Sequence, residues 1–265
     1  MIVENSLFTD KVALVTGSSR GIGKAVALAF AKAGADVLVN HSKPEGTSKT
    51  KAEGVCRQIE ELGRKSVAVA ADIGSKASVG EMMEAVYGWR GRLDFLVLSA
   101  ARAPFKPIEK LLEREMKQLV ETNYMGNIFC IQKALPLLEA SGGKIVFISS
   151  LGSRFYNPSY PLGSMKAAME TLVRDCAQSF AQRGVQVNAV CGGIVRTDSF
   201  KTLRQYMDDL ENIPDELCVS PEALADVVVF LCSPLARGIC GQTIVVDNGL
   251  SNSLYRPAWA KKPKL

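Results

Sequence analysis

Short apolar runs alternate along the chain with longer segments in which apolar residues recur every three or four positions. The short runs predict buried strands, and the longer segments predict amphipathic helices. Their regular alternation predicts an α/β fold, a doubly wound parallel sheet of about seven strands with helices on both faces. Strands are expected near residues 12–16, 36–40, 66–70, 94–98, 144–149, 185–190 and 243–246, and helices near 22–34, 48–62, 76–89, 112–139, 160–182, 199–209 and 221–232. Because no repeat or linker interrupts the alternation, residues 1–265 are expected to form a single domain.

The first predicted strand leads directly into a glycine-rich turn. Residues 11–23 read KVALVTGSSRGIG, which places Gly17, Gly21 and Gly23 between a strand and a helix. In such a turn Gly17 permits the tight bend, Gly21 lets the backbone approach a phosphate, and Gly23 lets helix and strand pack closely. The free N–H groups of the helix N-terminus attract a pyrophosphate. The segment therefore predicts a Rossmann-type domain that binds a dinucleotide.

The end of the second predicted strand lacks the carboxylate that NAD-binding domains usually place there to bind the ribose hydroxyls. The chain instead reads Asn40, His41, Ser42 and Lys43, and Arg20 stands in the glycine turn. Cationic and hydroxyl groups without a carboxylate suit a 2′-phosphate, which an arginine can bind through two hydrogen bonds. NADPH is therefore expected rather than NADH. The alternative is that Arg20 and Lys43 are solvated surface charges.

Composition excludes several classes of protein and site. Of the 265 residues 47% are hydrophobic, but no apolar run reaches the ~18 residues that span a bilayer. The N-terminus lacks the shape of a signal peptide, so a cytoplasmic location is expected. The net charge of +5 is not arranged as a basic stripe, which argues against a nucleic-acid partner. Seven cysteines without C-x-x-C spacing and one histidine argue against a metal site.

Several ordered motifs extend beyond the glycine turn. They are AADI at 70–73, SAAR at 99–102, NYMG at 123–126, ISS at 148–150 and GQTIVVDNG at 241–249. Together with T-G-x-x-x-G-x-G from Thr16 to Gly23, these motifs resemble the short-chain dehydrogenase/reductase (SDR) family from Lys11 to about Ser251. SAAR departs from the family's N-N-A-G at Ser99 and Arg102. We expect the cofactor to contact Gly17, Ser19, Arg20, Gly21, Ile22, Gly23, Asn40, His41, Ser42, Asp72, Ile73, Ser99, Ala100, Ala101, Lys166, Gly193, Ile194 and Thr197.

The resemblance also implies a set of catalytic residues. In the family a tyrosine donates a proton to the substrate oxygen, a lysine lowers that tyrosine's pKa and holds the ribose, a serine orients the substrate, and an asparagine supports a water relay. Asn123, Ser150 and Lys166 match this set. The usual Y-x-x-x-K spacing, however, places Leu162 at the tyrosine position, and the nearest tyrosine is Tyr160.

Pro161 suits the first turn of a helix, so Tyr160 is expected in the loop before it, where its direction is free. The SDR-type enoyl-acyl-carrier-protein reductases have a similarly displaced tyrosine, one residue farther from the lysine. Gly192–Gly193 and Thr197 also resemble those enzymes. Tyr156 is a second candidate for the proton donor, and either tyrosine is alternatively a packed loop aromatic.

Three functions follow from these residues. The first is an NADPH-dependent reductase of enoyl thioesters, bound to acyl carrier protein or coenzyme A, in fatty-acid or polyketide-type metabolism. The second is a 3-ketoacyl or carbonyl reductase, and the third is a non-redox protein such as a cyclase, an isomerase or a ligand binder. An apolar stripe within 198–218 predicts a substrate lid, and residues 252–265 form a tail. The resemblance implies a homo-oligomer, a dimer or a tetramer.

Overall fold

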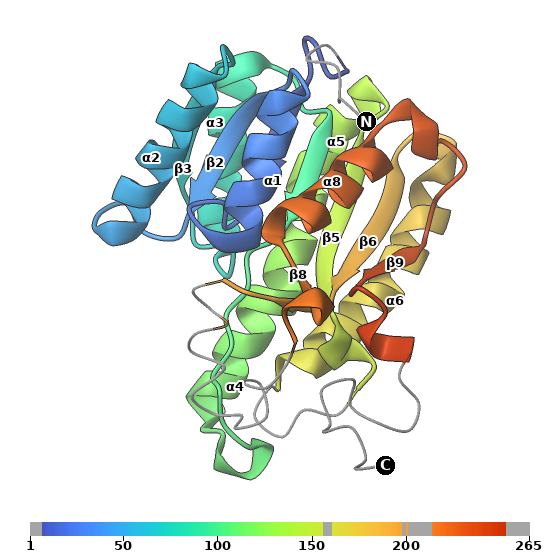
Figure 1. Cartoon of the computed structure of the whole chain (residues 1–265). Helices are drawn as coiled ribbons and strands as arrows, with labels where there is room; N and C mark the ends of the chain where they lie inside the picture. Colours follow the sequence, from blue (N-terminus) through green and yellow to red (C-terminus); the bar gives the residue numbers. More distant parts are fainter. Residues whose placement is uncertain (1–6, 156–160, 198–199, 201–213, 253–265) are drawn as a thin grey trace.

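Seven strands form one parallel sheet in the order β3-β2-β1-β4-β5-β6-β9 (Figure 1). The computed structural model describes residues 7–155, 161–197, 200 and 214–252. The strands are β1 (Val12–Val15), β2 (Asp36–His41), β3 (Ser66–Ala70), β4 (Phe95–Leu98), β5 (Lys144–Ser150), β6 (Gln186–Gly192) and β9 (Thr243–Val246). All seven predicted strands are confirmed. A separate parallel pair joins β7 (Ile194–Val195) to β8 (Cys218–Val219).

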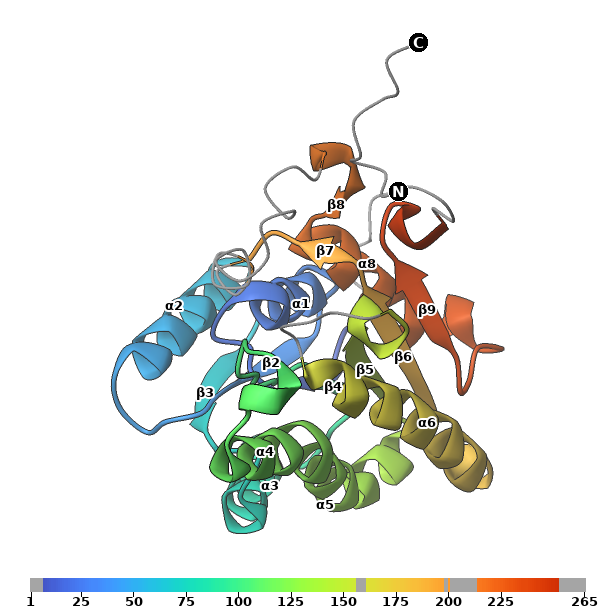
Figure 2. The same cartoon turned by 90° about the horizontal axis from the view of Figure 1, so that it is seen from below.

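Helices cover both faces of the sheet, as the alternation predicted. Figure 2 shows α1 (Gly21–Lys32), α2 (Thr47–Glu61) and α8 (Pro221–Cys232) on one face. The other face carries α3 (Lys76–Arg90), α5 (Gly126–Ser141) and α6 (Leu162–Phe180). The central strands are buried on both sides, so their side chains enter two cores in turn, whereas the edge strands β3 and β9 are partly exposed. Short 3₁₀ turns are η1 (Ile108–Lys110), η3 (Leu151–Ser153), η4 (Ala181–Arg183), η6 (Asp215–Leu217), η7 (Pro234–Ala236) and η8 (Leu250–Asn252).

One predicted helix is divided in the structure. The sequence predicted a single helix over 112–139, but α4 (Glu113–Val120) is joined to α5 by a π-helical turn, η2 (Glu121–Met125). A π turn inserts one residue into the helical repeat and is common at functional sites. Here it carries Asn123, whose side chain bonds backbone outside the helix. The predicted helix over 199–209 and most of the predicted lid lie outside the described residues, as does almost all of the tail.

The carboxyl ends of the strands meet at one edge of the sheet, which faces downward in Figure 1 and toward the viewer in Figure 2. The order of strands changes direction at β1, which lies between β2 and β4. Parallel sheets of this type bind ligands outside the carboxyl edge at such a reversal. The turn after β1 and the loop after β4 meet there.

Among the described residues no helix is long and apolar enough to cross a membrane.

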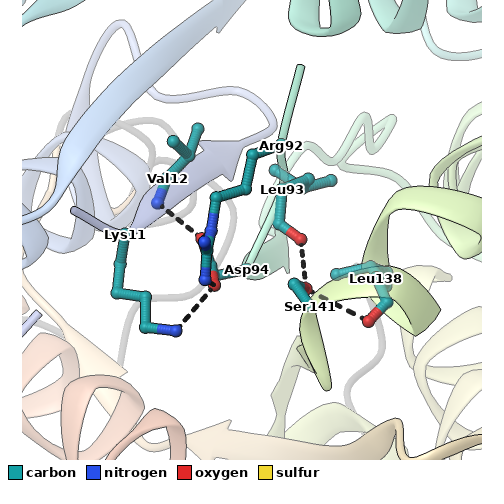
Figure 3. A network of polar contacts seen from close by, with 7 residues as sticks. All are labelled: Lys11, Val12, Arg92, Leu93, Asp94, Leu138 and Ser141. Atoms are coloured by element: carbon teal, nitrogen blue, oxygen red, sulfur yellow. Dashed lines mark hydrogen bonds and ion pairs between the residues drawn. The ribbon is translucent and has the colours of Figure 1, made fainter. Parts of the chain in front are cut away.

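The amino ends of β1 and β4 are joined by an ionic network on the opposite edge (Figure 3). The Asp94 carboxylate accepts hydrogen bonds from the Val12 N–H at 3.0 Å, from Lys11 Nζ at 3.0 Å and from two nitrogens of Arg92 at 2.7 Å. Burial opposes ionisation of Asp94, but these hydrogen bonds outweigh it and lower its pKa. The network therefore stabilises the fold at neutral pH, away from the carboxyl edge.

Candidate functional site

The glycine turn is packed too tightly for side chains at two positions. Gly17 has φ +64°, and a Cβ there would lie 2.8 Å from Ala100 Cα in the loop after β4. A Cβ on Gly23 would lie 2.6 Å from the Gly17 carbonyl oxygen. The turn, the start of α1 and the loop after β4 are therefore held together by backbone contact. Thr197 also reaches the turn, 3.7 Å from the Cβ position of Gly21.

Two buried polar side chains support the turn from beneath. Thr16 Oγ1 accepts hydrogen bonds from the N–H groups of Ser99 at 3.0 Å and Ala100 at 3.1 Å. Asn40 Oδ1 accepts from Gly17 N–H at 3.0 Å, while its Nδ2 donates to backbone carbonyls, among them that of Ala71 at 3.2 Å. The amide of Asn40 is thus bonded to the scaffold on both of its polar atoms.

Predicted cofactor contacts at the end of β2 divide into buried and exposed residues. Asn40 and His41 are buried, and the His41 ring Nδ1 lies 2.7 Å from the Lys43 carbonyl oxygen. Their side chains are directed into the protein rather than toward the carboxyl edge. Ser42 and Lys43 are exposed, as is Arg20 on the adjoining turn. The groups of this segment that face solvent are therefore a hydroxyl and cations.

The N-terminus of α1 fits a phosphate group. Arg20 is the N-cap residue, so no side-chain oxygen caps the first N–H groups, and the first turn holds no acidic residue. Uncapped N–H groups at the positive end of the helix dipole bind anions. Ser19, Gly21 and Ile22 are partly exposed around this turn. The residues present therefore fit the pyrophosphate of a dinucleotide.

Asn123 holds the loop that follows β4. Its Oδ1 accepts from the Arg102 N–H at 3.0 Å, and its Nδ2 donates to the carbonyl oxygens of Arg102 at 2.7 Å and Leu119 at 2.8 Å. The residue is buried in the π turn. Asn127, one turn later, donates from Nδ2 to the Asn123 carbonyl at 2.7 Å. The side chain of Asn123 therefore joins the backbone of this loop to the π turn through hydrogen bonds.

Ser150 and Lys166 come together at the end of β5. The Ser150 hydroxyl is buried and has no hydrogen-bond partner among the described residues. Lys166 on α6 is buried, and its Nζ donates to the Ile148 carbonyl at 2.6 Å and lies 4.6 Å from the Phe147 ring centroid. Burial lowers the pKa of Lys166 to about 8, although the acidic groups of Cys191 and Glu170 act in the opposite direction.

The first turn of α6 contains no proton donor at the usual family position. Leu162 is the first residue of the helix and is 2% exposed, with Pro161 as the N-cap. The predicted start of the helix beside Pro161 is therefore confirmed. Tyr160 and Tyr156, the two predicted proton donors, lie outside the described residues.

The remaining predicted contacts lie along the carboxyl edge. Gly193 at the end of β6 would place a Cβ 2.7 Å from Asp247 Cβ, and its N–H donates to the Val246 carbonyl at 2.9 Å. Ile194 begins β7, and the Thr197 N–H donates to the Val195 carbonyl at 2.9 Å. Asp72 is exposed after β3, Ile73 is buried, and Ala101 is exposed beside Arg102.

Comparison with known proteins identifies the family. A family model described as enoyl-(acyl carrier protein) reductase matches residues 17–251. The chain belongs to the short-chain dehydrogenase/reductase family. The 1-cyclohexenylcarbonyl-CoA reductase of Streptomyces collinus is 38% identical over 249 residues, covering 91% of this chain and 87% of that protein. The 3-oxoacyl-[acyl-carrier-protein] reductase FabG of Staphylococcus epidermidis is 35% identical over 245 residues, covering 91% and 99%.

A solved SDR structure shares the whole architecture. The short-chain dehydrogenase from Burkholderia cenocepacia, crystallised in complex with NADP, has a TM-score of 0.83 and 29% identity and covers 94% of this chain and all of that one. The SDR resemblance drawn from the glycine turn and the later motifs is therefore confirmed, and with it the fold class. The chain is a member of a family of oxidoreductases.

Three polar residues near this site were not predicted from the sequence. Asn127, Glu170 and Cys191 are all buried, and the acidic groups of Glu170 and Cys191 act to raise the pKa of Lys166. A signal for Glu170 was available, because it stands four residues after Lys166 on a helix face otherwise formed by apolar residues such as Val173. No sequence signal distinguished Asn127 or Cys191 from ordinary helix and strand residues.

Proposed function

We propose that this SDR protein is an NADPH-dependent reductase of enoyl thioesters carried by coenzyme A or acyl carrier protein. The observation that carries the proposal is Leu162, a buried leucine four residues before Lys166, where the ketoreductase spacing requires a tyrosine. We therefore assign the proton donor to the segment that precedes α6 in the sequence, as in the SDR-type enoyl reductases. The matching family model and the Streptomyces relative, a reductase of an unsaturated acyl-CoA by its name, support the same reading.

The proposed cofactor contacts follow the geometry of the carboxyl edge. The uncapped N–H groups between Arg20 and Gly23 would hold the pyrophosphate, and Arg20 with Ser42 would meet the 2′-phosphate. Asp72 and Ile73 would flank the adenine, and Ser99 to Ala101 would line the wall after β4. Lys166 would hold the nicotinamide ribose, and the segment from Gly193 to Thr197 would contact the carboxamide.

Residues of this chain would donate hydrogen bonds to the thioester oxygen of the substrate. When bound, NADPH would supply a hydride to the β-carbon, and the α-carbon would take a proton from the Tyr160 hydroxyl or from water, which completes the saturated thioester. Negative charge develops on the thioester oxygen during this transfer, and hydrogen-bond donors aimed at that oxygen lower the barrier. We assign these donors to Ser150, whose hydroxyl is unpartnered within the described part of the chain, and to Tyr160. The Lys166 ammonium would lower the pKa of that tyrosine.

A 3-ketoacyl reductase is the second candidate, favoured by the 35% identity to the staphylococcal FabG protein. In that case Tyr160 would protonate the carbonyl oxygen of a ketone substrate.

Assembly as a dimer or tetramer also stays a prediction, which light scattering of the purified protein tests.

The deciding experiment follows NADPH absorbance with crotonyl-CoA and acetoacetyl-CoA as paired substrates, then with the same acyl groups on acyl carrier protein. We expect faster oxidation of NADPH with the crotonyl thioester. Faster turnover of the acetoacetyl thioester would make the protein a ketoreductase. No turnover of either, together with tight ligand binding, would favour the non-redox alternative.

Two tyrosine variants separate the proton donor from a packed aromatic. Tyr160→Phe should lower turnover by roughly two to four orders of magnitude, the scale of a lost acid catalyst, and leave NADPH affinity nearly unchanged. Tyr156→Phe is the matched control and should retain most activity. The reverse pattern would transfer the role to Tyr156, and normal activity in both variants would remove the support for a loop tyrosine.

A further inference from the structure

A buried carboxylate lies directly behind Ser150 and Lys166. Glu170 is one helical turn after Lys166 on α6 and is 8% exposed. Its Oε1 accepts hydrogen bonds from Ser149 Oγ at 2.5 Å and Ser153 Oγ at 2.6 Å, and its Oε2 lies 3.7 Å from an Arg154 nitrogen. One side chain of the helix therefore binds three residues of the neighbouring strand and turn.

Those three residues lie on both sides of Ser150 in the sequence. Ser149 immediately precedes Ser150 at the end of β5. Ser153 closes η3, and Arg154 is its C-cap residue, two positions before the segment that contains Tyr156 and Tyr160. Contact between the turn and the helix is close, because a Cβ on Gly163 would collide with the Gly152 carbonyl oxygen. Glu170 thus fixes the backbone on both sides of Ser150.

Burying a carboxylate for packing alone is unfavourable. The desolvation of an ionised carboxylate is offset only by hydrogen bonds and charge partners, whereas an apolar residue of similar size has no such cost. The neighbours Met169 and Val173 show that this part of α6 accommodates apolar side chains. A carboxylate placed here, with two hydroxyl donors of its own, therefore indicates a role that a hydrophobic residue would not fill.

We propose that Glu170 is a positioning residue of the reductase: it holds Ser150 and the turn Leu151–Ser153 in place beside Lys166, and its negative charge keeps Lys166 protonated. This inference rests on the proposed function. It assigns Glu170 no contact with substrate or cofactor, because its carboxylate is bonded to Ser149 and Ser153.

The charged groups around Lys166 support the second part of the proposal. On α6 the nearby acid is Glu170, and on β6 it is Cys191. Burial raises the pKa of Cys191 to about 11, so its thiol is neutral at pH 7. β5 contributes only the Ile148 carbonyl and the Phe147 ring. Glu170 is therefore the anion that opposes the loss of the Lys166 proton, although Arg154, exposed beside it, reduces that effect.

The test compares Glu170→Gln with Asp175→Asn, a matched loss of charge at an exposed position of the same helix. Glutamine retains the size of the side chain and one oxygen acceptor. For whichever thioester the wild type reduces, we expect Glu170→Gln to lower kcat about 10- to 100-fold, the scale of a slightly misplaced reacting group. The alkaline limb of its pH–rate profile should move to lower pH, because Lys166 loses its proton more easily. Asp175→Asn should change neither quantity, and Glu170→Asp should restore the profile in part.

Two measurements made without turnover separate this inference from the proposed function. The pH dependence of NADPH affinity, followed by fluorescence, should shift in Glu170→Gln, and hydrogen exchange of the amides at 151–155 should accelerate. If the wild type reduces neither thioester, the proposed function fails while these two results still test Glu170. Should Glu170→Gln not fold, Ser153→Ala removes one hydrogen bond and should show the same faster exchange. Unchanged kcat, pH profile and exchange in a folded Glu170→Gln protein would overturn the inference.

Discussion

Replacing Lys166 by methionine should make the protein more stable and inactive at the same time. The lysine is buried on α6 with its ammonium against the Ile148 carbonyl and the Phe147 ring. Methionine has a similar length and no charge to desolvate. Residues that serve a reaction are often held in states that the fold alone would not choose. Lys166→Met therefore separates the requirement for stability from the requirement for activity.

The magnitude follows from the pKa of the buried ammonium. Burial lowers that pKa from 10.5 to about 8. Since one pKa unit corresponds to about 1.4 kcal/mol, keeping the ammonium charged in the folded protein costs about 3 kcal/mol at neutral pH. Methionine removes this cost and loses one hydrogen bond from a charged donor to the Ile148 carbonyl, worth about 2 kcal/mol. The net gain in the free energy of unfolding is about 1 kcal/mol, or about 2–4 °C in Tm for a domain of this size.

The sign of the pH dependence provides the sharper assay. Below pH 8 the lysine is protonated in both the folded and the unfolded chain, so the wild type bears the full cost of burial. Between pH 8 and about 10.4 the folded chain binds fewer protons, and wild-type stability from this group rises. The advantage of Lys166→Met should therefore be greatest below pH 8 and shrink as the pH rises above it.

Thermal and urea unfolding of both proteins at pH 7 and at pH 9.5 measures this difference. Lys144→Met is the control, because Lys144 on β5 is a partly buried lysine whose pKa burial also lowers, and it is bonded to the Ser233 carbonyl at the amino edge. It should leave turnover intact, whereas Lys166→Met should abolish it. A Tm for Lys166→Met equal to or below that of the wild type at pH 7 would refute the reasoning, and so would a gain of equal size at both pH values.

Three further predictions address the cofactor turn and the fold. Arg20→Ala should weaken NADPH binding at least tenfold more than NADH binding, about 1.4 kcal/mol by calorimetry; equal losses for both nucleotides would contradict a 2′-phosphate contact. Gly17→Ala should destabilise the protein and abolish nucleotide binding, because the new Cβ would lie 2.8 Å from Ala100 Cα at a φ of +64°. Asp94→Asn should cost about 2 kcal/mol in urea unfolding at pH 7, since it removes charged hydrogen bonds. The pKa of Asp94 is lowered in the fold, so its contribution is complete above the unfolded value of about 4 and is lost as pH falls through the folded value. The free energies of unfolding of Asp94→Asn and the wild type should therefore become equal at acid pH.

The sheet and most helices were predictable because both cores are built from simple periodic patterns. Val12 to Val15 form a continuous apolar run, and each of these residues enters one of the two cores. The division of the helix over 112–139 was not predictable in the same way. Apolar periodicity is compatible with one helix, and it does not report the hydrogen bonds that Asn123 of the π turn makes to Arg102, which is distant along the chain.

Site residues were predictable where their role depends on the local backbone conformation. They were not predictable where their role depends on hydrogen-bond partners that only the tertiary structure brings near. Gly17 and Gly23 could be assigned because a tight turn after a strand requires glycine. Asn40 was assigned to the cofactor from its place at the end of β2, but its amide is bonded to Gly17 and to the backbone after β3. Whether a buried asparagine faces a ligand or the scaffold depends on which backbone groups the tertiary structure brings to it.

Polar groups at the carboxyl edge fall into two sets, and the difference between them supports the proposed place of the ligand. Thr16, Asn40 and Asn123 have their hydrogen bonds completed by the protein, and these residues fix the loops. The Ser150 hydroxyl and the first N–H groups of α1 have no such partners among the described residues. Buried polar groups in folded proteins are nearly always paired, so we propose that ligand atoms bind the groups left open at this edge. Open N–H donors at one end, with a buried ammonium and an open hydroxyl at the other, call for a ligand that is anionic at one end and presents oxygen acceptors at the other. A dinucleotide with a thioester beside its reactive end meets that requirement.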